Sequence, residues 1–406
     1  MQQVDLNYVV YHLHSDLSNG VTNIDSVTKF KEYITRAKEL GMKALGFSEH
    51  GSVFEWYHKK EAIEEAGMKY IHAIEAYVTE TLDEKIRDNY HCVLIALNDE
   101  GRKEINRLSS RSFNRKDNHY YYAPRILMDD IENTSDNILI TTACLGGVLN
   151  KGNDEFQKRF LKFLINNKHR CYLEIQHHNV EDQKKYNKAM YELSKKYGIP
   201  LIAGTDTHAL NETHMEGRKI LQLSKGVHFA DEDAWDLTFK SFQELCDAYW
   251  LQDALPKEVW FEAIMETNCM AERVQEFTLD RNTKYPKIYQ NPLETYKNKI
   301  NQAYKVHPYI RKRYKSSEIN PVIKEEVAVY EKTKSIDFML LQTYLREWEK
   351  EHDIFCGYGR GSVSGSEVAY VLGITQMDSK KFGLNFFRLH KAEVKRCELL
   401  GSCKAA

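Results

Sequence analysis

The feature that most constrains the fold of this chain is a repeated alternation of amphipathic helical patterns with short apolar runs. Apolar residues recur at helical spacing from Lys29 to Leu40, Gly41 ends that helix, and an apolar run follows at Ala44 to Phe47. The same alternation returns several times as far as Ala203. Strands that alternate with helices are typical of parallel sheets. Seven or so such units predict an α/β fold, a closed (β/α)7-type barrel, with an open doubly wound sheet as the alternative.

The boundaries of the remaining elements follow from the same periodicity. We predict a strand over Val9 to His14 and further strands at 70–74, 91–97, 137–142, 171–176 and 200–203. We predict helices at 54–66, 99–111, 154–166 and 180–197. An aromatic and charged loop, residues 118–122, interrupts the alternation.

The pattern changes beyond Leu210, where helical runs dominate. A polar stretch with two prolines, residues 278–292, marks a boundary, so we predict one domain over 1–275 and a second over 276–406. In the second domain, residues 322–350 predict one long helix or two, and residues 353–356 predict a short strand that leads into a glycine-rich loop.

Composition limits the classes of protein that fit. The 406 residues carry a formal net charge of -2, which excludes a global basic surface for nucleic acid and requires any DNA contact to be local. Eight scattered cysteines with no CxxC pair argue against a disulfide framework and favour a reducing, cytoplasmic location. No apolar run reaches the ~18 residues that a membrane span needs, so we expect no membrane partner.

Candidate metal ligands stand at the ends of the predicted strands. His12 and His14 lie two residues apart on one strand, so their side chains point to the same side. A buried histidine pair at a sheet edge is the alternative. Against it, residues of ligand type follow or flank nearly every later strand: Glu49, His50, Glu75, His91, Cys144, Glu174, His178, Asp206 and His208. In a barrel these ends meet at one face.

Imidazole, carboxylate and thiolate together suit zinc, manganese or iron. Several such ions held close together clamp the attacking and leaving oxygens of a phosphodiester. The sequence therefore predicts a metal site at the strand ends. We expect four other histidines to be ordinary core or surface residues: His72, His119, His177 and His214.

Five short motifs mark these strand ends: His12-Leu13-His14-Ser15, Ser48-Glu49-His50-Gly51, Ile74-Glu75-Ala76-Tyr77, Cys144-Leu145-Gly146-Gly147 and Gly204-Thr205-Asp206-Thr207-His208. Together they resemble the PHP (polymerase and histidinol phosphatase) domain, in particular the one at the N-terminus of bacterial replicative DNA polymerase III alpha subunits. The resemblance implies a distorted β/α barrel, followed by a mainly helical segment.

The resemblance also implies a site with zinc or manganese ions. The ligands that it implies are His12, His14, Asp25, His50, Glu75, His91, Cys144, Asp206 and His208, of which His12, His14, His50, Asp206 and His208 are the catalytic candidates. Asp25 is the best substitute for an acid that the family has after the first histidine pair, and Asn19 and Asp16 are the alternatives. Glu49 stands where the family usually has Asp.

A glycine-rich loop lies between Cys356 and Ser366, directly before an apolar helical run at 367–372. Glycines let a backbone approach phosphate groups, Arg360 can pair with a phosphate oxygen, and a helix start offers free N–H groups. The loop lacks the Gly-Lys-Ser/Thr of a P-loop and the acid of a dinucleotide fingerprint. A flexible hinge is the alternative interpretation.

The loop Gly-x-Gly-Arg-Gly-Ser-x-x-Gly-Ser resembles the palm motif of the same polymerase family. This implies that the triphosphate of a dNTP, with Mg²⁺, is held by Gly359, Arg360, Gly361, Ser362, Gly365 and Ser366. A palm also needs three carboxylates for its two magnesium ions. The resemblance stops near Leu389, before those carboxylates, so we expect a partial palm from a truncated or split polymerase gene.

Three functions fit these observations. The first is the N-terminal part of a DNA-directed DNA polymerase, a nucleotidyltransferase that acts in DNA replication on a primer-template and dNTP. The second is a stand-alone PHP phosphoesterase or 3′–5′ exonuclease. The third is a non-catalytic module that completes a split polymerase together with a second polypeptide. A barrel that binds metal but is inactive stays open as an alternative for the metal site.

Overall fold

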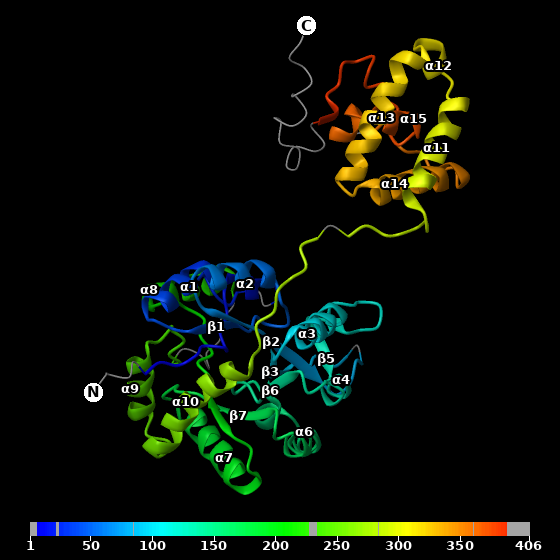
Figure 1. Cartoon of the computed structure of the whole chain (residues 1–406). Coiled ribbons are helices and arrows are strands. Elements are labelled where there is room, and N and C mark those ends of the chain that lie inside the picture. Colours follow the sequence, from blue (N-terminus) through cyan, green and yellow to red (C-terminus); the bar gives the residue numbers. More distant parts are fainter. Residues whose placement is uncertain are drawn as a thin grey trace. The chain divides into compact units, whose positions relative to one another are not determined.

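The computed structural model describes residues 6–21, 24–83, 85–226, 234–282, 284–359 and 361–387. The chain divides into two compact units, Met1–Thr278 and Leu279–Ala406, which we describe separately (Figure 1). No helix within the described ranges combines the length and the apolar composition that a membrane crossing requires.

A mixed, curled sheet of eight strands forms the centre of the first unit. Its strands are β1 (Ala44–Phe47), β2 (Lys69–Thr79), β3 (Tyr90–Ala96), β4 (Tyr120–Tyr121), β5 (Ala123–Leu127), β6 (Ile138–Thr141), β7 (Cys171–Ile175) and β8 (Leu201–Ala203). They lie in the order β4-β5-β2-β3-β6-β7-β8, and β1 pairs with the first residues of β2. The predicted α/β fold is confirmed.

The segment from Val9 to His14 links the two ends of this sheet. It is not the regular strand that we predicted, because it forms only isolated parallel bridges, Val10 with Leu45 and Leu13 with Thr207. The amide of His14 donates to the carbonyl of Thr207 over 2.8 Å. The segment therefore lies between β1 and the residues that follow β8, which curls the sheet toward closure and brings both of its ends to His12 and His14.

The expectation of a purely parallel sheet is wrong. Strand β3 runs antiparallel to both β2 and β6, and the described residues between β2 and β3 form no helix. The predicted loop at 118–122 contains β4, which pairs with β5 in a hairpin. The reversal has a consequence for the site, because the start of β3 lies at the same edge as the carboxyl ends of β2 and β6, and His91 stands at that start.

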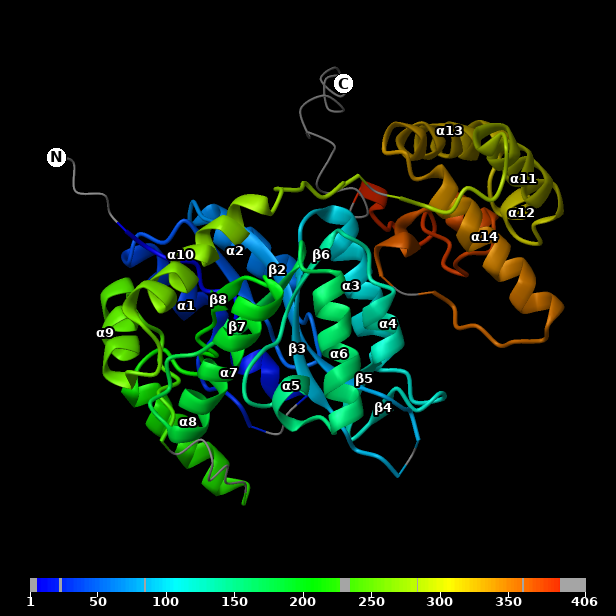
Figure 2. The same ribbon diagram turned by 90° about the horizontal axis from the view of Figure 1, so that it is seen from below.

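Helices surround the sheet (Figures 1 and 2). They are α1 (Phe30–Glu39), α2 (Trp56–Glu65), α3 (Asp99–Ser112), α4 (Met128–Glu132), α5 (Val148–Lys151), α6 (Asp154–Asn166), α7 (Glu181–Tyr197), α8 (Glu212–Ser224), α9 (Phe242–Gln252) and α10 (Lys257–Arg273). Each helix predicted in this unit forms within two residues of its expected bounds. Helix α3 shows why, since the side chain of Asn98 accepts hydrogen bonds from two amides of the first turn and Ile105 is buried.

The described part of the second unit is helical. It contains α11 (Pro292–Val306), α12 (Ile310–Arg313), α13 (Ser316–Lys332), α14 (Ile336–Glu351), the short 3₁₀ turn η3 (Ser362–Gly365) and α15 (Glu367–Val371). Buried side chains such as Tyr296, Met339 and Val368 form its own core. The strand predicted at 353–356 is wrong, because the amide of Ile354 closes the end of α14 by donating to the carbonyl of Glu349.

Candidate metal centre

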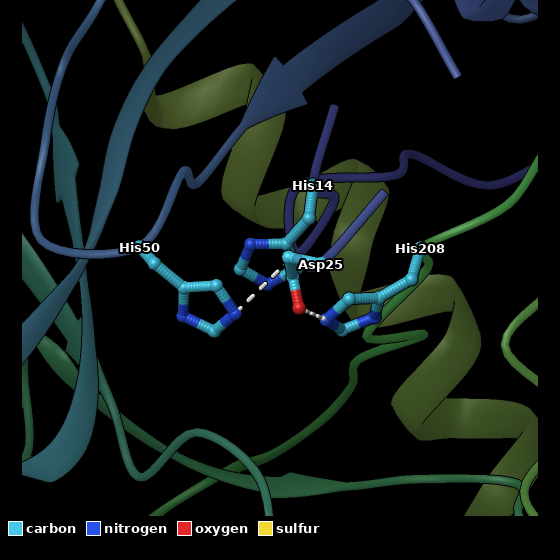
Figure 3. A group of neighbouring side chains, drawn as sticks. All are labelled: His14, Asp25, His50 and His208. Carbon is cyan, nitrogen blue, oxygen red and sulfur yellow. Dashed lines mark ion pairs between the residues drawn. The ribbon is translucent and has the colours of Figure 1, made fainter. Parts of the chain in front are cut away.

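Side chains from the strand ends of the first unit converge into three overlapping groups. Within each group the ligand atoms lie within 4.8 Å of one another. The groups are His14, Asp25, His50 and His208 (Figure 3); His12, His14, Glu75 and Asp206; and His50, Glu75 and His91. His14, His50 and Glu75 each belong to two groups, so the three groups form one continuous centre.

The distances within the centre are short enough for shared cations. The Nε2 atom of His12 lies 3.2 Å from Glu75 Oε1 and 3.1 Å from Asp206 Oδ1. Asp25 lies between two imidazoles, with Oδ1 3.2 Å from His208 Nε2 and Oδ2 3.3 Å from His50 Nε2 (Figure 3). Each carboxylate therefore faces at least two histidine nitrogens.

Buried polar atoms without a hydrogen-bond partner provide the test of whether metal ions fit here. Such atoms are rare in proteins, and each costs about 1–3 kcal/mol when nothing satisfies it. Six such atoms converge on this one centre, where they face one another as histidine–carboxylate ion pairs but form no hydrogen bond: His12 Nε2, His14 Nε2, Asp25 Oδ2, His50 Nδ1, Glu75 Oε2 and Asp206 Oδ1. Divalent cations would satisfy these nitrogen and oxygen atoms together, so the donor set fits them.

The electrostatics prepare the carboxylates and His14 for a cation. Burial raises the pKa of Glu75 and of Asp206, but the surrounding histidines outweigh it and hold both pKa values well below the usual range. Burial, together with the neighbouring imidazoles of His50 and His208, lowers the pKa of His14 to about 4. Ionised carboxylates and a neutral imidazole are the forms that bind metals.

Cys144 lies beside the third group without belonging to it. Its Sγ atom is 3.3 Å from His91 Nδ1 and 3.8 Å from Glu75 Oε1. Burial is the largest cause that raises the pKa of the thiol well above its usual value, and Asp206 and Glu75 add to it. The neighbouring Gly146 gives the ring of His91 room, because a Cβ there would lie 3.0 Å from it.

Of the three candidates for the ninth ligand, the structure brings Asp25 into the centre. The side chain of Asn19 instead accepts hydrogen bonds from the amides of Asp25 and Ser26, so it shapes the loop that carries Asp25. Asp16 lies in the 3₁₀ turn η1 (Asp16–Gly20) and belongs to none of the three groups.

Glu174 is a supporting residue and not a member of any group. Its carboxylate lies 2.6 Å from His12 Nδ1 and accepts hydrogen bonds from Tyr11 and Thr141. A carboxylate on the far nitrogen fixes the tautomer and orientation of a histidine that binds metal. Any side chain at Gly204 would collide with this carboxylate. His178 is stacked on Trp235 and also lies outside the groups.

Three further supporting residues were missed by the sequence analysis. Lys59, on α2, forms a buried ion pair with Glu49 over 2.5 Å, and Ser18 links Glu49 to His14. Arg218, on α8, donates to the carbonyl of Asp25. Lys59 could have been noticed, because it precedes the buried Ile63 by one helical turn and so lies on the core-facing side of α2. The sequence around Arg218 does not indicate its contact with Asp25.

The four histidines expected to be ordinary residues belong to none of the three groups. His72 interacts with Tyr70 and Asn106, and His119 with Asp117. His214 contacts Thr28, and His177 lies against Tyr249.

A cleft of about 1180 Å³ opens onto the centre. Asp25, His50, His91, Asp206 and His208 line its inner wall, so the grouped side chains are reachable from outside. Lys151, Lys185 and Trp235 contribute to its walls farther out. Glu181 and Asp182 line it as well, and Lys185 pairs with Asp182 over 3.3 Å, so the opening carries both signs of charge.

The glycine-rich loop of the second unit has a different environment. Gly359 and Gly361 adopt left-handed φ values of +98° and +78°, and Gly361 and Ser362 are exposed. A Cβ at Gly359 would lie 2.7 Å from Thr375 Oγ1, so glycine is required there. Gly365 is buried, and Arg360 lies outside the described residues.

The expectation of free N–H groups at the following helix is wrong. The carboxylate of Glu326, from α13, accepts hydrogen bonds from the amides of Glu367 and Val368 and from the hydroxyl of Ser366. The amide of Ala369 donates to the Ser366 hydroxyl. The first turn of α15 is therefore capped from within the protein, and Ser366 serves as its cap.

Comparisons with known proteins agree with this architecture. Residues 11–178 match the PHP domain family, and residues 293–396 match the family described as the bacterial DNA polymerase III alpha NTPase domain. The DNA polymerase III subunit alpha of Aquifex aeolicus is 30% identical over 95% of this chain. The chain is thus similar to DNA polymerase III alpha subunits over nearly all of its own length.

Other relatives have the same name. The DNA polymerase III alpha subunit of Borreliella burgdorferi is 29% identical over 95% of the chain, and that of Treponema pallidum is 27% identical over 96%. The chain spans about a third of the length of these relatives, 35%, 34% and 34% respectively. The resemblance found in the motifs is thus confirmed for the PHP region and for the segment that contains the glycine-rich loop.

Proposed function

We propose that the first unit of this chain is a metal-dependent phosphodiesterase, a 3′–5′ exonuclease within a protein of the DNA polymerase III alpha type that acts in the cytoplasm in DNA replication. The observation that supports this most strongly is the continuous centre of three ligand groups. Histidines and carboxylates fill it, and six of their buried atoms lack a hydrogen-bond partner. Zinc or manganese suits this donor set, and the catalytic residues proposed are His12, His14, His50, Asp206 and His208.

The ions, when bound, polarise the phosphate and activate a water molecule. The residues of the chain hold and orient the reacting groups. Glu174 fixes the ring of His12, and the pair of Lys59 and Glu49 holds Ser18 against His14. In the hydrolysis, the oxygen of water bonds to phosphorus, the bond to the leaving 3′ oxygen breaks, and that oxygen takes up a proton.

Nucleotide release from a labelled single-stranded oligonucleotide tests this function. The purified chain should release nucleotides with Mn²⁺ or Zn²⁺ and lose this activity with a chelator. The double variant Asp206→Asn with His208→Ala should abolish release, because it removes one ligand from each of two groups. His169→Ala is the matched control, since that histidine is exposed and pairs with Asp136. Undiminished hydrolysis in the double variant would exclude this centre as the active site.

We propose a second role for the glycine-rich loop of the second unit, which is to hold the triphosphate of a dNTP with Mg²⁺ opposite a DNA primer-template. The match of residues 293–396 to the polymerase NTPase family supports it. Because the first turn of α15 is capped by Glu326, we assign the binding to the part of the loop before it, Gly359, Arg360, Gly361 and Ser362, with Gly365 and Ser366 shaping the turn.

A further inference from the structure

A row of aromatic side chains lies near the metal centre and has no role in it. We call Phe54, Phe113, Tyr120, Tyr121 and Tyr122 the aromatic row. The rings of Phe54 and Phe113 have centroids 5.8 Å apart, those of Phe113 and Tyr120 are stacked at 5.9 Å, and those of Tyr121 and Tyr122 meet edge to face at 4.7 Å. These contacts form two groups of rings, and each group presents one ring to solvent, since Phe54 is 41% exposed and Tyr122 is 61% exposed.

Two arginines lie over rings of this row. The guanidinium carbon of Arg87 is 3.6 Å from the centroid of Tyr122, and that of Arg115 is 4.5 Å from the centroid of Tyr120. Both arginines are exposed, and neither forms an ion pair with a carboxylate in the described part of the chain. Their charges are therefore available to an anion that also contacts the rings.

The framework beneath the row is rigid. The buried guanidinium of Arg125 donates to the carbonyls of Ile86 and Asn118, over 2.7 and 2.5 Å, and so ties the loop that carries Arg87 to the hairpin of β4 and β5. Tyr122 has a left-handed φ of +62°, a conformation that is unfavourable for a tyrosine. A strained residue that projects a large ring into solvent contributes little to folding, which points to a role in binding.

The hairpin of β4 and β5, which carries the three tyrosines of the row, lies beside the metal centre. The ring of Tyr77 is stacked on that of His50, and on β2 this tyrosine pairs with Arg125 of β5. A Cβ at Gly51, the residue after His50, would collide with Pro124 of the hairpin. One layer of side chains thus separates the hairpin from the ligands of the centre.

We propose that the aromatic row binds single-stranded nucleic acid, with bases stacked on its exposed rings and phosphates paired with Arg87 and Arg115. Aromatic rings interleaved with cations suit a single strand, because its bases offer free faces, whereas a duplex buries them. The acidic net charge of the whole chain makes such a local site necessary for any strand. The further step, that the bound strand delivers its end to the metal centre, rests on the proposed function.

Binding is tested apart from hydrolysis. The full chain with Asp206→Asn, in a chelating buffer, is titrated into a fluorescent single-stranded oligonucleotide, and anisotropy gives Kd. We expect Tyr122→Gly to weaken binding by about fivefold or more, since each base–aromatic stack contributes at least that factor. Glycine suits the left-handed backbone, so this variant keeps the fold. Arg87→Gln should reduce the slope of log Kd against log salt by about 0.7.

Matched controls remove a ring and a charge elsewhere on the same unit. Trp250→Leu removes an exposed ring from α9, on the opposite side of the sheet from the hairpin (Figure 2), and Arg111→Gln removes an exposed arginine that is already paired with Asp130. Both should leave Kd unchanged. A duplex of the same sequence should bind more weakly than the single strand and be insensitive to Tyr122→Gly.

Specific outcomes overturn the proposal. Equal affinity of Tyr122→Gly and the parent for the single strand would remove the row as its site, and so would an equal dependence on Tyr122 in duplex binding. Absence of strand binding by the parent would leave the exposed rings as a protein contact and would also refute the inference. If binding depends on the row but the chain with intact Asp206 releases no nucleotide, the proposed hydrolysis fails while the binding surface stands.

Discussion

The metal centre of the first unit and the glycine-rich loop of the second were both predicted from short motifs, but the structure gives them opposite environments. At the metal centre, buried nitrogens and oxygens converge without hydrogen-bond partners. At the start of α15, the amides of Glu367 and Val368 already donate to the carboxylate of Glu326. The ligand atoms of the metal centre are therefore still able to bind a cation, whereas the amides at the start of α15 already have acceptors within the protein.

The difference teaches which kind of site a motif can predict. Ligands at strand ends are brought together by the topology of a sheet, because the ends of neighbouring strands meet at one edge whatever the details of packing. The donors of a helix start can be satisfied by any acid that packs against them. Here that acid stands 41 residues before Glu367, on α13, where nothing in the local sequence of the loop indicates it.

The largest effect should come from Glu75, which belongs to two of the three ligand groups. Glu75→Gln removes a charge that faces His12, His50 and His91, so we expect fewer bound metal ions and a loss of hydrolysis of about a thousandfold, or about 4 kcal/mol. Metal analysis and nucleotide release measure the two effects. Glu64→Gln, at an ion pair on α2, is the control and should behave as the parent chain. Full metal content in the Glu75 variant would show that the groups do not act as one centre.

The second prediction concerns Glu326 and sharpens the contrast directly. Glu326→Ala leaves two amides and a hydroxyl without their acceptor, so the second unit should lose about 2–4 kcal/mol of unfolding free energy. Hydrogen–deuterium exchange of peptides from α13 to α15, followed as a function of urea, reports on this unit. The exposed neighbour Glu325 provides the control variant Glu325→Ala, which should lie within about 0.5 kcal/mol of the parent. An unchanged midpoint for Glu326→Ala would contradict the assignment of the carboxylate as a cap.

A smaller effect, on metal affinity, is expected from a substitution of Glu174, which supports the centre without belonging to a group. Glu174→Gln keeps the shape of the side chain but removes the charge beside His12 Nδ1, so metal affinity should fall by about ten- to a hundredfold. Tyr11→Phe, which removes one hydrogen bond to the same carboxylate, should have a weaker effect in the same direction. Competition with a colorimetric chelator measures both. Equal affinities for parent and Glu174→Gln would show that His12 does not bind metal.

The part of the site that sequence could predict is the part set by topology and periodicity. His12 and His14 share a side because they are two residues apart, and Asp206 and His208 follow a strand that ends beside them. His91 was predicted from its place at a strand start, yet it reaches the centre only because β3 is antiparallel, which the alternation of helices and strands did not indicate. Arg218 and Glu326 reach their partners because helices far apart in the sequence pack together. The periodicity of apolar residues does not indicate which helices pack together.

The smallest predicted effect tests whether the glycine-rich loop binds at all without the helix start. Arg360→Ala should weaken the affinity for a dNTP with Mg²⁺ by about tenfold, since a charge-assisted pair with a phosphate oxygen contributes about 1.4 kcal/mol or more. Arg311→Ala, on α12, removes an arginine from the same unit and should leave the affinity unchanged. Because the amides of α15 are already occupied, the loop before it must carry the binding, and Arg360 is its cation. Equal triphosphate affinity after Arg360→Ala would mean that the loop is a hinge. The loop would then have no binding role, in contrast to the metal centre.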